Sequence, residues 1–179
     1  VVMISYRPDV PSGIAMSFNS AVVEIAFDYY MCACSMRHHK ANIAAVLCTL
    51  SIEIAFKSFL VQPVEHIGQA NELYDGFNGH KLDVLYGELP EKISPFLINL
   101  KDMALLKQYS QFFIKGRYAY EACSDSGVNH TSHYELMKLA GSIILNIVYL
   151  YQMNGCDDKF IKDFDIDSFY EKNVQYVLR

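Results

Sequence analysis

Two polar groups in this largely apolar chain carry residue types that can do acid-base or phosphate chemistry. The first is Glu53 with Lys57, set one helical turn apart inside the apolar stretch Ala41 to Leu60. A glutamate four residues before a lysine is the favourable order for an ion pair on a helix. The pair is therefore either an ordinary surface ion pair or part of a functional groove.

The second group lies within Phe113 to Glu121, FIKGRYAYE. On a helix Arg117 and Glu121 fall one turn apart on the same face, with Tyr118 and Tyr120 flanking them. A guanidinium oriented by a carboxylate can bind phosphate or steer a substrate. The same residues can instead form a structural salt bridge under an aromatic lid, and the sequence leaves both interpretations open.

Other candidate chemistry is weaker. Cys123, His130 and His133 are metal-ligand types, but their spacing matches no standard zinc site, so we predict no metal and no cofactor. The chain also lacks the glycine-rich nucleotide loops, zinc-hydrolase motifs and nucleophile elbow of common enzyme classes. No residue receives a catalytic role from the sequence.

Composition places the chain among globular proteins of one domain. It has 179 residues, of which 52% are hydrophobic and 20% charged, and its formal net charge is −5. That charge argues against non-specific binding to nucleic acid. Five irregularly spaced cysteines suggest reduced thiols, and the longest apolar run, Leu139 to Tyr151, is too short to span a bilayer. We therefore expect a cytoplasmic protein with no membrane partner.

Apolar spacing predicts helices and no strands. Helices are expected over 14–36, 41–60, 79–89 and 132–153, and an irregular stretch over 64–78. Residues 95–121 should form one helix or, preferably, two, over 95–106 and 105–121. The predicted buried stripes of the first two helices are Phe18, Val22, Ile25 and Tyr29, then Ile43, Leu47, Leu50 and Ile54.

The predicted class is thus all-α, an antiparallel bundle of four to five main helices. Residues 1–12 would form an N-terminal extension outside the bundle, 13–155 the bundle itself, and 156–179 an acidic, aromatic segment packed on it. His80 is expected near the start of a short helix, hydrogen-bonded to the central bundle.

Three stretches in this order, SIEIAFKSFL with Glu53 and Lys57, GHKLDVLYGELPEKI with His80, and GRYAYE with Arg117 and Glu121, precede a long apolar helix. Together they resemble the HEPN superfamily over roughly residues 41–153. The resemblance implies a dimerising helical bundle. Many such proteins are RNA-cleaving toxins or defence effectors, and others are non-catalytic partners of nucleotidyltransferases.

The chain departs from that family at its ribonuclease signature, an arginine followed four to six residues later by a histidine, because none of its four arginines has one. We therefore expect a non-catalytic, HEPN-like dimerising or partner-binding module in a defence or toxin-antitoxin setting. A homodimer is expected, with a nucleotidyltransferase as a second kind of partner. The alternative is a divergent ribonuclease or nucleotide-binding protein that uses Arg117 and Glu121, with His80 folded close to them.

Overall fold

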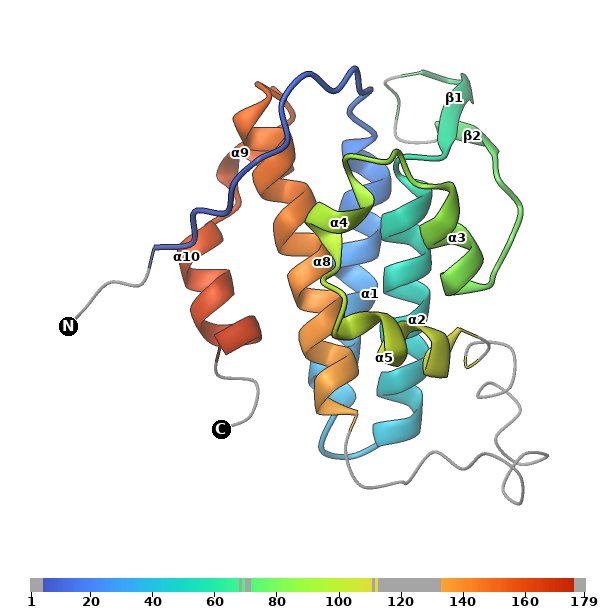
Figure 1. Cartoon of the computed structure of the whole chain (residues 1–179), viewed down its shortest axis with the longest axis vertical. Coiled ribbons are helices and arrows are strands. Elements are labelled where there is room, and N and C mark those ends of the chain that lie inside the picture. Colours follow the sequence, from blue (N-terminus) through green and yellow to red (C-terminus); the bar gives the residue numbers. More distant parts are fainter. Residues whose placement is uncertain (1–4, 68, 70–71, 111, 113–132, 176–179) are drawn as a thin grey trace.

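Three long helices form the centre of the protein. The computed structural model describes residues 5–67, 69, 72–110, 112 and 133–175. The long helices are α1 (Ser20–Met36), α2 (Ala41–Lys57) and α8 (Tyr134–Met153) (Figure 1). A tight turn joins α1 to α2, so the two are antiparallel neighbours, and α8 packs against both. Phe59, just after the end of α2, contacts Tyr151 near the end of α8, and Asn42, near the start of α2, contacts His133 at the start of α8. The helices α2 and α8 are therefore parallel.

Shorter elements surround these three helices. They are β1 (Val61–Glu65), β2 (Leu73–Gly76), α3 (Leu82–Glu88), α4 (Ser94–Leu97), α5 (Asp102–Tyr109), α9 (Lys159–Asp163), α10 (Ile166–Phe169) and the π-helix η1 (Tyr170–Gln175). Figure 1 shows α3 beside α2, α4 over α8, and α9 and α10 along the other flank of α8. The mostly helical architecture confirms the predicted class. The described residues contain three long helices, fewer than the four to five main helices expected.

The stretch expected to hold one or two helices over 95–121 divides at Asn99. Its Oδ1 accepts hydrogen bonds from the backbone N–H groups of Lys101 and Asp102, at 2.9 and 3.1 Å. Asparagine favours such local bonds over a continuous helix. Up to Tyr109 the chain thus forms two elements, α4 and α5, but they divide at 98–101 and not near residue 105 as expected.

The region expected to be irregular, 64–78, instead contributes to a two-stranded antiparallel hairpin. Val61 lies opposite Gly76, and Pro63 opposite Tyr74. Both strands are edge strands, where a proline without an N–H is tolerated. A Cβ at Gly76 would lie 2.4 Å from the Leu60 carbonyl oxygen, so glycine is needed for this close approach. The sequence shows no alternation of apolar and polar residues over these strands, because both strands are exposed along most of their length.

The first helix begins at Ser20, not near residue 14 as expected. Gly13 has a positive φ of 68°, and Asn19 is the helix N-cap residue. The Asn19 side-chain amide donates to the carbonyl oxygens of Ser58 (2.7 Å) and Val61 (3.0 Å), so it ties the start of α1 to the end of α2. The second helix correspondingly ends at Lys57 rather than Leu60.

The predicted buried stripes of α1 and α2 are only partly correct, because Val22 is buried and the half-buried Leu47 and Ile54 pack against the core. Of the four residues expected on α1 only Val22 is buried, and Ile25 keeps 47% of its surface exposed. On α2, Ile43 is likewise 47% exposed, and the other three predicted residues are half-buried. The buried faces are built mainly from small residues and one aromatic on each helix: Val23, Ala26, Tyr30 and Ala33, then Ala44, Ala45, Cys48, Ile52, Ala55 and Phe56.

Small side chains explain why the buried faces of α1 and α2 differ from the predicted stripes. They let α1 and α2 approach closely enough for the Ser51 hydroxyl to donate to the Ala26 carbonyl oxygen at 2.7 Å. Alanine and cysteine carry weak hydrophobic signal, so a periodicity count follows the larger residues on the opposite side. Ile25 and Ile43 therefore keep about half of their surface exposed, although other large residues of the two helices, such as Tyr30 and Phe56, are fully buried.

The last long helix, α8, is buried on nearly all sides. Its predicted stripe is confirmed, because Leu136, Leu139, Ile143, Ile147 and Leu150 are all buried. By length and composition α8 is apolar enough to cross a membrane, but most of its apolar stretch is covered by the bundle, as in a core helix. Gly155, with a φ of 80°, follows the helix end as predicted.

The opening segment contacts the bundle, contrary to the expectation that it would lie outside. Residues 5–12 cross α8 and α10 as an extended strap (Figure 1). The Tyr6 ring meets Tyr149 and Tyr170, and its hydroxyl donates to the Asn146 side-chain oxygen. Tyr6 N–H donates to Asp167 Oδ1 at 2.8 Å. Hydrogen bonds and aromatic ring contacts therefore hold the strap on the bundle.

Aromatic residues hold the C-terminal segment against α1. Phe160, Phe164 and Phe169 surround Phe27 with ring centroids 5.4 to 5.9 Å away. Such tilted and edge-on contacts are the favoured arrangements of aromatic pairs. One flank of α1 is thus covered by this segment, and another flank is covered by α2.

Candidate functional site

The carboxylate of Glu53 is the centre of a polar cluster within the bundle. Its Oε1 accepts a hydrogen bond from Lys57 Nζ at 2.8 Å and lies 2.9 Å from His80 Nδ1. Glu53 is only 3% exposed. The i,i+4 pair expected from the sequence therefore forms, but its acid is buried rather than at the surface.

The packing of α3 on α2 brings the three groups together. Glu53 and Lys57 project from α2, and His80 lies two residues before α3. The Lys57 and His80 side chains are 19% and 54% exposed, so the cluster reaches the surface through its two nitrogen-bearing partners.

A buried carboxylate needs charged or hydrogen-bonding partners to offset its lost hydration. Glu53 Oε1 has two such partners, whereas Oε2 accepts no hydrogen bond from the part of the chain that the structure describes. A carboxylate that contacts one nitrogen of an imidazole fixes the ring's orientation, which is the arrangement used to position a general acid or base.

A second carboxylate, Asp83, lies three residues after His80 in the first turn of α3. The Ser110 hydroxyl donates to Asp83 Oδ1, and the Asp83 N–H donates back to Ser110 Oγ at 3.3 Å. The hydrogen bond from Ser110 lowers the pKa of Asp83. This contact joins the start of α3 to the end of α5. Sequence reasoning missed it, although an aspartate in a first helical turn is a recognisable signal.

The other predicted site residues lie outside the described part of the chain. These are Arg117, Tyr118, Tyr120 and Glu121. The structure thus brings together Glu53, Lys57 and His80, and the predicted convergence of His80 with Arg117 stays a prediction.

Of the three metal-ligand types named from the sequence, the structure describes only His133. His133 is buried at the start of α8, with Nδ1 2.8 Å from the Tyr109 hydroxyl and Nε2 3.4 Å from Asn42 Oδ1. Cys123 and His130 lie outside the described ranges. Within those ranges no group of three or more His, Cys, Asp or Glu side chains could hold a metal ion.

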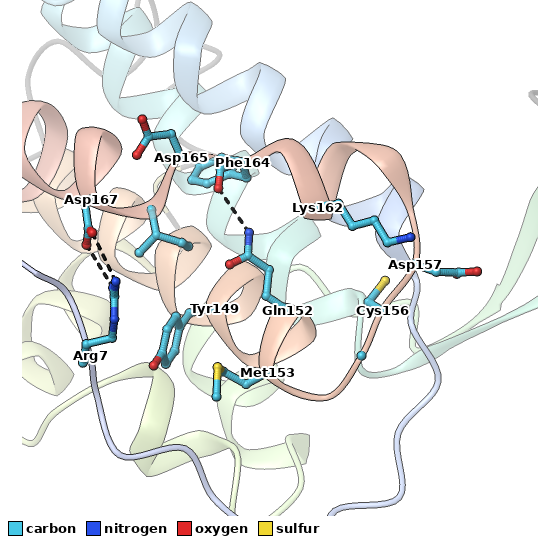
Figure 2. A pocket seen from close by; sticks show the side chains of 12 residues that line it. Arg7, Tyr149, Gln152, Met153, Cys156, Asp157, Lys162, Phe164, Asp165 and Asp167 are labelled. Atoms are coloured by element: carbon cyan, nitrogen blue, oxygen red, sulfur yellow. Dashed lines mark hydrogen bonds and ion pairs between the residues drawn. The ribbon is translucent and has the colours of Figure 1, made fainter.

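A pocket of about 770 Å³ lies elsewhere, between the end of α8, α9, α10 and the strap (Figure 2). Arg7 and Asp167 form an ion pair of 3.0 Å at its edge. Gln152 donates to the carbonyl oxygens of Ile161 (2.6 Å) and Phe164 (3.1 Å). None of the residues predicted from the sequence lines this pocket, and these polar side chains are engaged in holding the C-terminal segment and strap.

The third surface of interest is the outward side of α1 and α2. We define the outer face by its apolar residues on the two helices: Ile25, Tyr29 and Cys32 on α1, and Ile43, Leu47, Leu50 and Ile54 on α2. Each of these residues is exposed or half-buried, and Leu47 and Ile54 also pack against the core. The described elements that pack on α1 include α2, α8 and α9, and Phe169 of α10 contacts Phe27 and Tyr30.

Comparison with known proteins gave no relative: no family model matches the chain, and no curated protein or solved structure shows a significant match.

Proposed function

We propose that this protein is a HEPN-like helical bundle without catalysis of its own, acting as a dimerising or partner-binding module. The observation that carries the proposal is the outer face, where apolar residues of α1 and α2 stay exposed or half-buried, with Ile25 and Ile43 each 47% exposed. Exposed apolar residues that gather on one surface are typical of an interface.

The energetics favour covering this face. Fully burying one isoleucine or leucine side chain stabilises by roughly 1.5 to 3 kcal/mol, so covering half-exposed residues at several positions contributes several kcal/mol. That gain is available only to a partner that matches the ridges of two antiparallel helices.

The resemblance to the HEPN superfamily supports the biological setting. It favours a role in defence or in a toxin-antitoxin pair, with a nucleotidyltransferase as a partner besides a second copy. The missing arginine-to-histidine signature supports a module that binds rather than cleaves.

The test is the mass of the protein in solution as a function of concentration. We expect wild type to associate, and we expect Ile25→Ser combined with Ile43→Ser to weaken association about 30-fold, since about 1 kcal/mol is lost at each half-exposed position. Leu100→Ser is the matched control, because Leu100 is 92% exposed and lies between α4 and α5, away from the outer face. Equal association of all three proteins would refute a role for the face.

The contact between Glu53 and His80 favours a second candidate function, a divergent ribonuclease or nucleotide-binding protein. A buried carboxylate orienting a surface imidazole can serve proton transfer at a phosphodiester, with Lys57 adding positive charge. The test is cleavage of RNA in a chelator by wild type, His80→Gln and Glu53→Gln. Cleavage by wild type that both substitutions abolish, in variants that still fold, would establish this function over the first.

A further inference from the structure

We propose that the pocket between the end of α8, α9, α10 and the strap binds a small organic cation that carries an apolar body, such as an aryl-alkyl amine. The pocket shares no residue with the outer face or with the Glu53 cluster, so this inference is independent of the proposed function. It follows from the shape of the pocket, from one hydroxyl without a partner and from the sign of the surrounding charges.

The pocket has the size and the apolar surface of a small-molecule site. Its volume of about 770 Å³ lies within the roughly 300 to 1,000 Å³ that is typical of ligand pockets. Figure 2 shows Tyr149 and Met153, near the end of α8, on one side and Phe164, between α9 and α10, on another. Met153 is 60% exposed, and a methionine side chain adapts its shape to its neighbours. An apolar ligand body can therefore pack on two aromatic rings and a flexible thioether.

The hydroxyl of Tyr149 is a polar group that the fold leaves unused. Tyr149 is only 8% exposed, yet its hydroxyl has no hydrogen-bond partner among the residues that the structure describes. The oxygen is not sealed in the core, because the fully buried side-chain atoms without a partner in those residues belong to Glu53 and Tyr151. In Figure 2 the hydroxyl points between Arg7 and Met153, which also line the pocket. A phenol oxygen accepts hydrogen bonds as well as donating one, so it can accept from an ammonium N–H.

The charges around the pocket leave it net negative. Arg7 and Asp167 neutralise each other through their ion pair of 3.0 Å. The other charged lining residues are all exposed, and none forms an ion pair within the described ranges: Asp157, Asp165 and Lys162. Two carboxylates and one ammonium leave one negative charge, and the C-terminal end of α8 adds the partial negative charge of the helix dipole. The pocket therefore attracts a cation more than an anion.

The carboxylates and the aromatic rings together define the kind of cation. Asp165 accepts a hydrogen bond from the Ser168 N–H through Oδ1 at 2.9 Å, which leaves its Oδ2 for a ligand. Tyr149 and Phe164 offer ring faces, which attract ammonium groups. Within the described residues no group of three or more His, Cys, Asp or Glu side chains could hold a metal ion. The lining thus suits an organic ammonium better than a bare metal ion.

The exposure of the charged lining residues sets the expected affinity. Charges that water still reaches contribute little on their own. For an amine of about nine non-hydrogen atoms, we therefore expect a dissociation constant of the order of 1 mM.

The first test compares three probes of similar shape and different charge. They are phenethylamine, a cation, phenethyl alcohol, which is neutral, and phenylpropionate, an anion. Binding is followed by the methyl NMR signal of Met153, and Met31, which is 43% exposed on α1 and outside the pocket, gives the control signal. We expect phenethylamine to shift the Met153 signal saturably without moving that of Met31. Phenylpropionate should bind at least about tenfold more weakly.

Substitutions in the lining test the sign of the charge. Asp157→Asn combined with Asp165→Asn should weaken phenethylamine binding about tenfold, whereas Lys162→Gln should strengthen it about threefold. Tyr149→Phe, which lacks the hydroxyl, should weaken it about threefold. Glu91→Gln is the matched control, because it neutralises an exposed carboxylate outside the pocket and should have no effect. Asparagine can still cap α10, and thermal melts verify that every variant folds.

The outcomes decide between a cation site, an anion site and no site. Absence of a saturable Met153 shift with phenethylamine would overturn the proposal. So would tighter binding of phenylpropionate than of phenethylamine, or weaker phenethylamine binding in Lys162→Gln, since both results would mark an anion site. Unchanged binding in both the double asparagine variant and Tyr149→Phe would show that the amine binds elsewhere. The proposed function is unaffected by any of these results, because association through the outer face is measured separately.

Discussion

Glu53 and His80, 27 positions apart in the chain, meet with the carboxylate Oε1 2.9 Å from the imidazole Nδ1. This contact joins the interior of α2 to the segment that leads into α3. The half-exposed His80 side chain thus contacts the buried carboxylate of Glu53. The pair is therefore both a structural tie and the described position best suited to proton transfer.

Replacing Glu53 tests the structural side of this contact. Glu53→Gln keeps the shape but removes the charge that Lys57 and His80 share, and we expect a loss of about 1 to 3 kcal/mol in the free energy of unfolding. Glu53→Ala should cost about 3 to 5 kcal/mol, since it also leaves a cavity beside a partly buried ammonium. Denaturant titration measures both, with the exposed Glu91→Gln as control. Changes within about 0.5 kcal/mol for all three variants would show that the cluster is not structural.

Gly141 lets α8 lie close to the Tyr30 side chain of α1. A Cβ there would lie 2.9 Å from the Tyr30 hydroxyl oxygen and 3.2 Å from its Cζ. We expect Gly141→Ala to destabilise by about 1 to 3 kcal/mol through overpacking. Gly87→Ala, in α3, meets nothing within 4 Å and should stabilise by up to about 1 kcal/mol. Adding Tyr30→Phe to Gly141→Ala should recover part of the loss in thermal melts, and no recovery would place the clash elsewhere.

Asp167 makes the attachment of the strap sensitive to acid. Hydrogen bonds from the Tyr6 N–H and from Arg7 lower the pKa of Asp167 below its ordinary value. Its stabilising contribution is therefore present above the ordinary pKa of about 4 and is lost as pH falls through the lower folded value. Because the side chain is 41% exposed, we expect Asp167→Asn to cost about 1 kcal/mol or less near neutral pH and nothing in strong acid. An equal loss of stability in Asp167→Asn at neutral pH and in strong acid would contradict the assignment of this acid sensitivity to the Asp167 carboxylate.

Tyr6 should make stability fall at alkaline pH, the opposite direction from Asp167. Burial, with smaller contributions from Tyr170 and Tyr149, raises the pKa of Tyr6 to about 12. The neutral phenol is favoured in the fold, so its contribution is complete below the ordinary pKa of about 10 and is lost as pH rises from there toward 12. Tyr6→Phe should lower stability by about 1 kcal/mol at neutral pH and flatten the alkaline decline. An unchanged alkaline profile in stability measured by denaturant would exclude Tyr6 as its source.

The sequence predicted the helical class and the ends of several helices, because prolines, glycines and long apolar runs act locally. The stop after α8 at Gly155 is of this kind, whereas the division between α4 and α5 was expected near residue 105 and lies at 98–101. The Glu53–Lys57 pair was also foreseen, since it depends only on helical spacing.

What the sequence could not supply depends on contacts between distant segments. The outward orientation of Ile25 and Ile43 is decided by how closely the alanine faces of α1 and α2 pack, which a periodicity count does not weigh. The burial of Glu53 depends on α3 covering α2, and the strap depends on Tyr6 reaching Asn146, 140 positions away. The Arg117 group lies outside the described residues, so that half of the candidate site stays a prediction.

The central claim, that the outer face of α1 and α2 is an interface, is tested most directly by the reactivity of Cys32. This cysteine is a free, exposed thiol within the face. Its alkylation rate, followed by mass spectrometry of its peptide, should be high in dilute protein and fall as concentration rises through the range in which the mass doubles. In the Ile25→Ser, Ile43→Ser variant it should stay high throughout. A Cys32 rate that is independent of concentration while the mass doubles would contradict the account and place the interface elsewhere.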